Sequence, residues 1–202
     1  MKKKLVTAAV SLIFISFLIL FLIWHFYNAD LAMKKTIETA EKVHEHADFK
    51  VYLDGKEYNF SRAKYMSDET KVLSQLIHLH DMDGEIIHKH ANGVALGQFF
   101  ESIGMKFNNT CFILDNKAQY CNRNNKTLKM YVNGILNNDF GNYELKDLDK
   151  ILISYGNDDE KQIRKQIGSV TDKACIQSEK CPERGLPTPE ASCSSNEICT
   201  VG

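Results

Sequence analysis

The hydrophobic pattern begins with a long apolar run near the N-terminus. Residues 5–26 consist mainly of Leu, Ile, Phe, Val and Ala, and no charged residue occurs from Leu5 to Ala29. A helix that crosses a bilayer needs about 20 consecutive apolar residues. The pattern therefore predicts a transmembrane anchor within residues 1–29.

The flanks of this run predict its orientation. Lys2, Lys3 and Lys4 precede it, and positively charged flanks stay on the cytoplasmic side. Trp24 and Tyr27 close it, as aromatic side chains do at membrane interfaces. A cleaved signal peptide is the alternative, but its apolar region is only about 7 to 15 residues long. We expect a single-pass membrane protein with an extracytoplasmic C-terminal domain, and either interpretation exports that domain.

Beyond the apolar run the pattern changes from helical to alternating. Residues 30–43 carry apolar positions at helical spacing among Lys and Glu, which predicts a helical stalk. Polar and apolar residues then alternate up to a tight turn at Asp54-Gly55, so a hairpin is expected over residues 48–60. A second hairpin is expected over residues 76–90.

One short helix and four further strands complete the expected domain. Apolar residues from Leu96 to Ile103 recur at i, i+3, i+4 and i+7, which predicts a helix with one side packed on a sheet. The pattern indicates an α+β fold, with a domain over residues 44–167 and a Cys-containing tail over residues 168–202. The four strands are expected at residues 110–114, 119–121, 128–132 and 150–155.

Part of this domain resembles a known family. The run MYVNG at residues 130–134, followed by YEL at 143–145 and DLDKI at 147–151, resembles the end of transcobalamin C-terminal-like β-grasp domains. The resemblance spans residues 94–156 and implies a mixed sheet that grips one helix. Leu148 stands where that family usually has Gly. No set of positions matches the family's cobalamin contacts, so the resemblance implies a β-grasp-like fold and no ligand.

The charge balance excludes one class of partner. The chain carries 25 Lys and Arg against 26 Asp and Glu. Nucleic-acid-binding domains carry a marked basic excess. We therefore expect no nucleic acid as a partner, and the sequence identifies no protein partner.

The cysteines indicate an oxidising compartment. They are even in number and all follow the apolar run, as in exported proteins whose disulfides persist. Cys111 and Cys121 flank an expected hairpin, where opposed residues can form a cross-strand bridge. The four tail cysteines allow three connectivities, of which two local bridges are the simplest, and a reduced metal cluster is the alternative. The disulfide candidates are Cys111, Cys121, Cys175, Cys181, Cys193 and Cys199.

Three His-x-His pairs are the candidate metal-binding residues of this sequence. Residues two apart in a strand project from the same face and lie about 6.5 to 7 Å apart at the backbone, so each pair can converge on one ion. Neutral imidazole is a common ligand of Zn, Cu and Ni. The candidate metal ligands are His44, His46, His78, His80, His88 and His90.

The register of the second hairpin decides whether its two pairs share a face. Opposed residues in an antiparallel pair have a constant sum of residue numbers, and an even sum places all four histidines on one face. A sum of 166 pairs His78 with His88, and a sum of 168 pairs His78 with His90. A two-residue loop at Asp83-Gly84 would give 167 and send the pairs to opposite faces.

The sequence favours metal binding over catalysis. Imidazole ligands with oxidised thiols favour Cu or Zn, followed by Ni. Asp81, Asp83 and Glu85 could accept hydrogen bonds from ring N–H groups. No general base and no H-E-x-x-H motif marks a catalytic site. We predict a membrane-anchored extracytoplasmic protein that binds Cu or Zn. The alternatives are a β-grasp domain that binds a small ligand or a protein without metal, and a metal-dependent enzyme.

Overall fold

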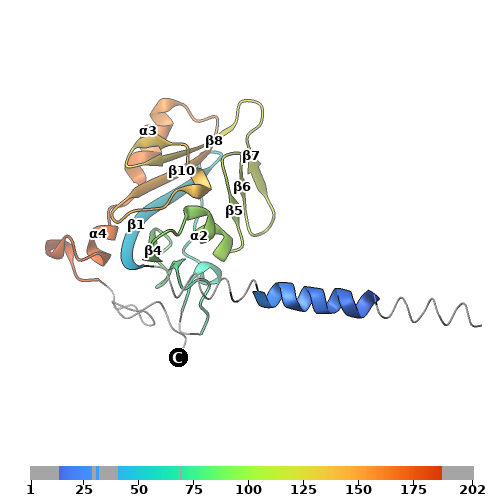
Figure 1. Ribbon diagram of the computed structural model, residues 1–202. Helices are drawn as coiled ribbons and strands as arrows, with labels where there is room; N and C mark the ends of the chain where they lie inside the picture. The colour runs from blue at the N-terminus through green and yellow to red at the C-terminus, as the bar shows by residue number, and fades with distance from the viewer. Residues whose placement is uncertain (1–13, 29–30, 32–40, 69, 188–202) are drawn as a thin grey trace, which may run out of the picture. The chain divides into compact units, whose positions relative to one another are not determined.

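The computed structural model describes residues 14–28, 31, 41–68 and 70–187. The chain divides into two compact units, Met1–Ala40 and Glu41–Gly202. In the first unit, residues 14–28 form a helix whose side chains are exposed. The strands and the candidate site belong to the second unit (Figure 1).

The predicted transmembrane anchor is wrong. In the described part of the chain, no helix combines the length and the apolar character that crossing a membrane requires. The single-pass topology, the membrane as a partner and the localisation that we derived from residues 1–29 are corrected accordingly; residues 1–13 and 29 lie outside the described residues.

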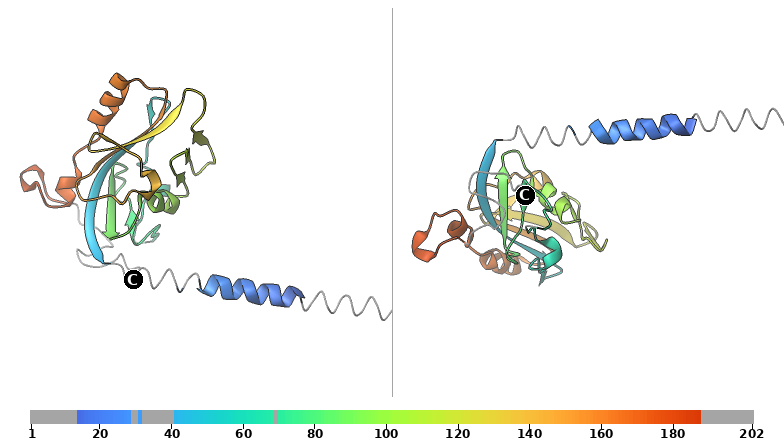
Figure 2. Two further views of the ribbon diagram at one scale, coloured as in Figure 1. Left: turned by 45° about the horizontal axis from the view of Figure 1, so that its top comes forward. Right: turned by 90° about the horizontal axis from the view of Figure 1, so that it is seen from below.

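The last two residues of the predicted helical stalk belong to a strand. Residues 30 and 32–40 lie outside the described part of the chain. The strand β1 (Lys42–Leu53) already begins at Lys42, inside the range predicted to be helical. It is long and curved (Figure 2), and alternate residues along its first part are exposed and half-buried.

A seven-stranded mixed sheet forms the framework of the second unit (Figure 1). Its strands are β1, β2 (Lys56–Glu57), β3 (Ile77–His78), β4 (Ile86–Ala91), β8 (Thr127–Val132), β9 (Ile135–Asn137) and β10 (Lys150–Gly156). The order is β3-β4-β1-β10-β8-β9, with β2 paired to the end of β1. β1 pairs antiparallel with β4 and parallel with β10, so it is a central strand.

A smaller sheet and several short helices complete the unit. Strands β5 and β9 were not predicted, because two or three residues are too few to show a period. The helix predicted from Leu96 is confirmed and buries its apolar side. The remaining elements are β5 (Lys106–Phe107), β6 (Cys111–Ile113), β7 (Gln119–Cys121), α2 (Leu96–Ser102), α3 (Glu160–Ser169), α4 (Ala174–Gln177), η1 (Ala63–Tyr65), η2 (Phe140–Asn142) and η3 (Pro182–Arg184).

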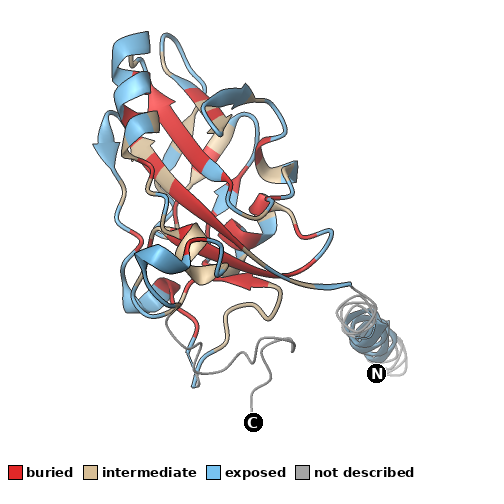
Figure 3. Cartoon of the chain, turned by 90° about the vertical axis from the view of Figure 1, so that its left-hand side faces the viewer, coloured by how far each residue is buried: buried red, intermediate tan, exposed pale blue. Residues whose placement is uncertain are grey.

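The two faces of β1 are covered by different parts of the chain. Successive side chains in a strand point to opposite faces. Phe49 packs against Phe99 of α2, with ring centroids 5.4 Å apart. Asp48 points the other way and accepts hydrogen bonds from the backbone N–H groups of Lys173 (2.9 Å) and Ala174 (3.0 Å) at the start of α4. Buried residues therefore run along the central strands (Figure 3).

The described part of the tail packs onto the sheet. Ala174 and Cys181 are buried, and a disulfide joins Cys175 to Cys181. The described tail residues therefore contact the sheet, and the domain boundary at residue 168 stays a prediction. Cys193 and Cys199 lie outside the described residues.

The cross-strand disulfide predicted in the small sheet is confirmed. Cys111 of β6 lies directly opposite Cys121 of β7, and the two sulfurs are bonded. The described residues contain no free cysteine. Disulfides of this kind are typical of oxidising compartments.

The turn before β10 forms although Leu148 replaces the glycine of the similar family. Leu148 has a φ of +69°, the left-handed region that glycine adopts most easily. Its N–H donates to the carbonyl oxygen of His46 at 2.7 Å, which ties this turn to β1. The relation to transcobalamin C-terminal-like domains is not tested by this geometry and stays a prediction.

The hairpin between β3 and β4 depends on Gly84. A Cβ atom at this position would lie 2.3 Å from the backbone nitrogen of Ser61 and 2.4 Å from the carbonyl carbon of Phe60. We expect Gly84→Ala to lower the free energy of unfolding by about 3 kcal/mol, because backbone atoms must move to admit the methyl group. Gly168→Ala in α3, where a Cβ would meet nothing within 4 Å, should instead stabilise by up to about 1 kcal/mol. Urea denaturation of both variants checks this, and equal midpoints would contradict it.

Candidate metal centre

The register of the histidine strands places four imidazoles on one face. In the β3–β4 pair, Ile77 lies opposite Lys89 and His78 lies opposite His88. The sum of these residue numbers is 166, so the even register that a shared face requires is confirmed. On its other side, His88 lies opposite His46 of β1. One row of histidines thus crosses three neighbouring strands.

All six predicted histidines belong to one continuous array of rings. The third His-x-His pair joins the array because β1 is the neighbour of β4 in the sheet. The ring centroids link His80 to His88 (3.8 Å), His88 to His46 (4.6 Å), His46 to His44 (4.6 Å), His44 to His90 (5.1 Å) and His90 to His78 (5.0 Å).

Most of this array is buried, and two of its histidines are more accessible to solvent. His44 is exposed, and the side chain of His80 is 11% exposed. The burial of four imidazoles in one place sets this array apart from a solvated polar face. The four buried histidines are His46, His78, His88 and His90.

Three of the histidines form the tightest potential ligand set. One ring nitrogen each of His44, His46 and His88 lies within 4.8 Å of the other two. Three imidazoles around one point can hold a metal ion. Two of these candidate ligands come from β1 and one from β4, and the register of the sheet places His46 directly opposite His88.

The hydrogen bonds around His46 select its tautomer. The hydroxyl of Ser178, at the end of α4, donates to a carboxylate oxygen of Asp147. The Ser178 oxygen lies 2.7 Å from Nδ1 of His46, so it accepts the proton carried by Nδ1. The Nε2 atom of neutral His46 then carries the lone pair that binds a metal.

A second chain of hydrogen bonds acts on His88. A carboxylate oxygen of Asp81 lies 2.8 Å from Nδ1 of His80, and a carboxylate can only accept, so Nδ1 carries the proton. Nε2 of His80 is therefore an acceptor, and it lies 3.0 Å from Nδ1 of His88. His88 donates through Nδ1 and presents the Nε2 lone pair. Hence His80 is placed to orient a ligand.

His78 has the same tautomer for a different reason. Its Nδ1 lies 3.0 Å from the carbonyl oxygen of Ser74, which can only accept a hydrogen bond. Nε2 of neutral His78 is then the nitrogen with the lone pair. The surroundings of His46, His78 and His88 thus all favour metal binding through Nε2.

Asp147 is ionised at neutral pH. Burial raises the pKa of its carboxyl, but hydrogen bonds from Lys180, Ser178 and the N–H of His46 outweigh burial and hold the pKa below the usual 3.8. An ionised carboxylate behind a hydroxyl and an imidazole strengthens the imidazole as a ligand.

The prediction that Asp81, Asp83 and Glu85 accept hydrogen bonds from the histidine rings is correct only for Asp81. Asp81 contacts a histidine, whereas Asp83 accepts the N–H of Glu85 at 2.8 Å in the turn. Glu85 pairs with Lys50 and Lys173. The sequence did not reveal three further partners of the histidines. Ser178 and Asp147 lie far from His46 in the sequence, and Ser74 contacts His78 through its backbone carbonyl group, which no residue pattern identifies.

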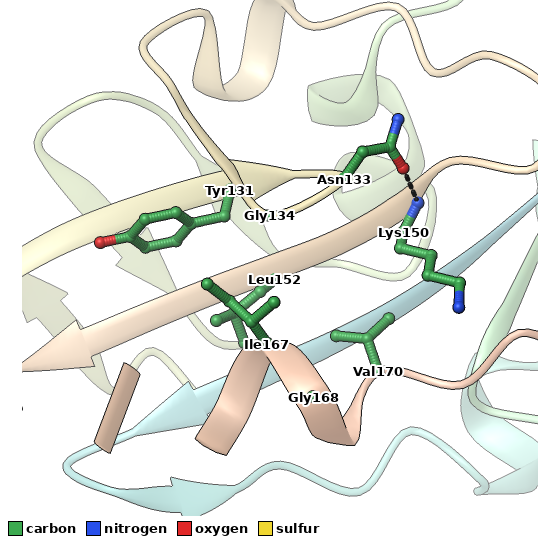
Figure 4. Close-up of a pocket in the computed structure, with 8 residues that line it drawn as sticks. All are labelled: Tyr131, Asn133, Gly134, Lys150, Leu152, Ile167, Gly168 and Val170. Atoms are coloured by element: carbon green, nitrogen blue, oxygen red, sulfur yellow. Dashed lines mark hydrogen bonds between the residues drawn. The ribbon is translucent and has the colours of Figure 1, made fainter. Parts of the chain in front are cut away.

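A separate cavity of about 360 Å³ lies between α3 and strands β8 and β10 (Figure 4). Tyr131, Leu152 and Ile167 form part of its wall, and Asn133 accepts the N–H of Lys150 at its edge. None of the six histidines lines it. The cavity is therefore distinct from the candidate metal centre.

No family model matches this sequence, and no curated protein or solved structure is significantly similar to it. The function is therefore inferred from the residues of the site alone.

Proposed function

We propose that this protein binds a transition-metal ion, Cu or Zn, through the imidazoles of His44, His46 and His88. The observation that carries this proposal is that ring nitrogens of all three lie within 4.8 Å of one another on one face of the sheet. His46 and His88 are held in the tautomer that presents Nε2.

The spacing is compatible with a single ion after small side-chain rotations. Imidazole nitrogens about 2.0 to 2.1 Å from a tetrahedral ion lie about 3.3 Å from one another. His44 is exposed and lies at the solvent side of the site, whereas His46 and His88 are buried and held by their surroundings. Binding therefore closes an arrangement that is already largely formed.

The donor atoms favour Cu(II) and Zn(II). Imidazole suits both ions, with Ni(II) next. The described cysteines are bonded in disulfides, so they offer no thiolate ligand. In the general affinity order, Cu(II) binds nitrogen sites more tightly than Zn(II). Three imidazoles leave a further coordination position for water or for another imidazole of the array.

Metal titration of the full chain tests the proposal directly. After removal of metal with a chelator and dialysis, we expect one equivalent of Cu(II) or Zn(II) to bind per chain, measured by isothermal titration and by elemental analysis after desalting. Bound metal should also raise the thermal unfolding temperature, because it binds only the folded state. A chain that retains no stoichiometric metal would refute the proposal and leave the cavity beside α3 as the leading candidate for a ligand site.

A further inference from the structure

A segment of the tail closes over the face of β1 that carries the histidines. We call residues 170–181 the cap; it contains α4. Its first part is held by Asp48, which accepts the backbone N–H groups of Lys173 and Ala174. Figure 1 shows α4 beside β1. The cap is therefore built onto the same strand as two of the three proposed ligands.

The far part of the cap is held by Asp147. Both the hydroxyl of Ser178 and the ammonium group of Lys180 bond to this carboxylate. Ser178 also accepts the Nδ1 proton of His46 at 2.7 Å. Asp147 in turn accepts the backbone N–H of His46 at 3.0 Å. The cap, the turn before β10 and the metal ligand thus meet at one carboxylate.

A disulfide encloses the residue that touches the ligand. Cys175 and Cys181 are bonded across a separation of six residues, and Ser178 lies between them. The helix α4 has only four residues, and helices this short are not stable on their own. Ser178 therefore depends on the disulfide and on its contacts with Asp147 for its position.

We propose that the cap positions His46 for metal binding, with Ser178 as the positioning residue and the Cys175–Cys181 disulfide as the bond that holds it in place. This inference rests on the proposed function. It makes the metal affinity depend on the thiol–disulfide state of the chain.

The redox step is a thiol–disulfide exchange. A dithiol reductant attacks the Cys175–Cys181 bond, passes through a mixed disulfide and leaves as an intramolecular disulfide. Two electrons and two protons end on Cys175 and Cys181 as thiols. The S–S crosslink is lost, so Ser178 becomes free to move away from Nδ1 of His46. The imidazole then loses its orienting partner, and the affinity for metal falls.

Substitutions test the cap without added thiols, which would themselves bind metal. The variants are Ser178→Ala and the double variant Cys175→Ser with Cys181→Ser, each titrated with Zn(II) and Cu(II) as the full chain. We expect each to bind about 10- to 100-fold more weakly, the usual effect of removing an outer partner of a ligating histidine.

The chain offers matched controls for both changes. Cys111→Ser with Cys121→Ser removes the other described disulfide, which lies in the small sheet. Ser102→Ala removes a serine hydroxyl of α2 that bonds to Phe99. We expect both controls to keep the parent affinity within about threefold, because neither contacts the histidine array.

Combining the cap variants separates positioning from general destabilisation. If both act through the contact between Ser178 and His46, adding Ser178→Ala to the disulfide variant should weaken binding no further. The inference would be overturned if the losses of metal affinity of the two variants multiplied in the combined variant, or if Ser178→Ala bound metal with the parent affinity. A parent chain that binds no metal would instead refute the proposed function. Thermal unfolding of each metal-free variant verifies that it is folded at the titration temperature.

Discussion

His46→Ala is expected to weaken Zn(II) and Cu(II) binding by roughly 10³-fold, because it removes one of the three imidazoles whose nitrogens lie within 4.8 Å of one another. His46 is 1% exposed, so the vacated position lies inside the protein, where water is a poorer ligand than imidazole. Competition titration with a chromophoric chelator measures the loss. His88→Ala should behave alike, because His88 is the other buried member of the triad.

A histidine outside the array provides the control for this prediction. His25 belongs to the helix of residues 14–28, in the other compact unit. His25→Ala should bind metal as the parent chain does. If His25→Ala and His46→Ala lose affinity equally, the metal is not held by the triad. Circular dichroism of the metal-free proteins shows whether His46→Ala is folded.

Lys89→Met is expected to lower the free energy of unfolding by about 2 to 3 kcal/mol, because it removes a buried ammonium group and leaves the partly exposed carboxylate of Glu45 and the carbonyl oxygen of Leu145 without their donor. Lys89 is 2% exposed and lies opposite Glu45 in the β1–β4 register. Its Nζ is 2.7 Å from a carboxylate oxygen of Glu45 and 3.2 Å from one of Glu144, and it donates to the carbonyl oxygen of Leu145 at 2.8 Å.

Lys89 also bears on the proposed metal site through its position in β4. It stands between His88 and His90, and its side chain points to the opposite face. The ion pair with Glu45 thus helps to keep the two histidine strands in register. Urea denaturation measures the loss, and Lys161→Met on the exposed side of α3 is the control, expected to change stability by less than about 0.5 kcal/mol. Equal effects of the two substitutions would contradict the structural role of Lys89.

Local sequence patterns predicted correctly those features that depend only on residues close together in the chain. The spacing from Leu96 to Ile103 predicted α2, because a helix places residues three and four apart on one side. The cysteines flanking a turn predicted the bond between Cys111 and Cys121, because a hairpin brings such residues face to face. Apolar composition misled us in residues 1–29, because in the described part of the chain no helix is both long and apolar enough to cross a membrane.

The sequence by itself determined which histidines can act together. In each His-x-His pair both side chains project from one face, because a strand has a period of two, and all six predicted residues do join one array. Only the tertiary structure decided that β1 and β4 are neighbours, and that Ser178 and Asp147 reach His46 from 132 and 101 residues away. Such contacts depend on which elements pack together. Sequence periodicity does not predict which elements pack together, because that depends on burial of the whole sheet and not on adjacent residues.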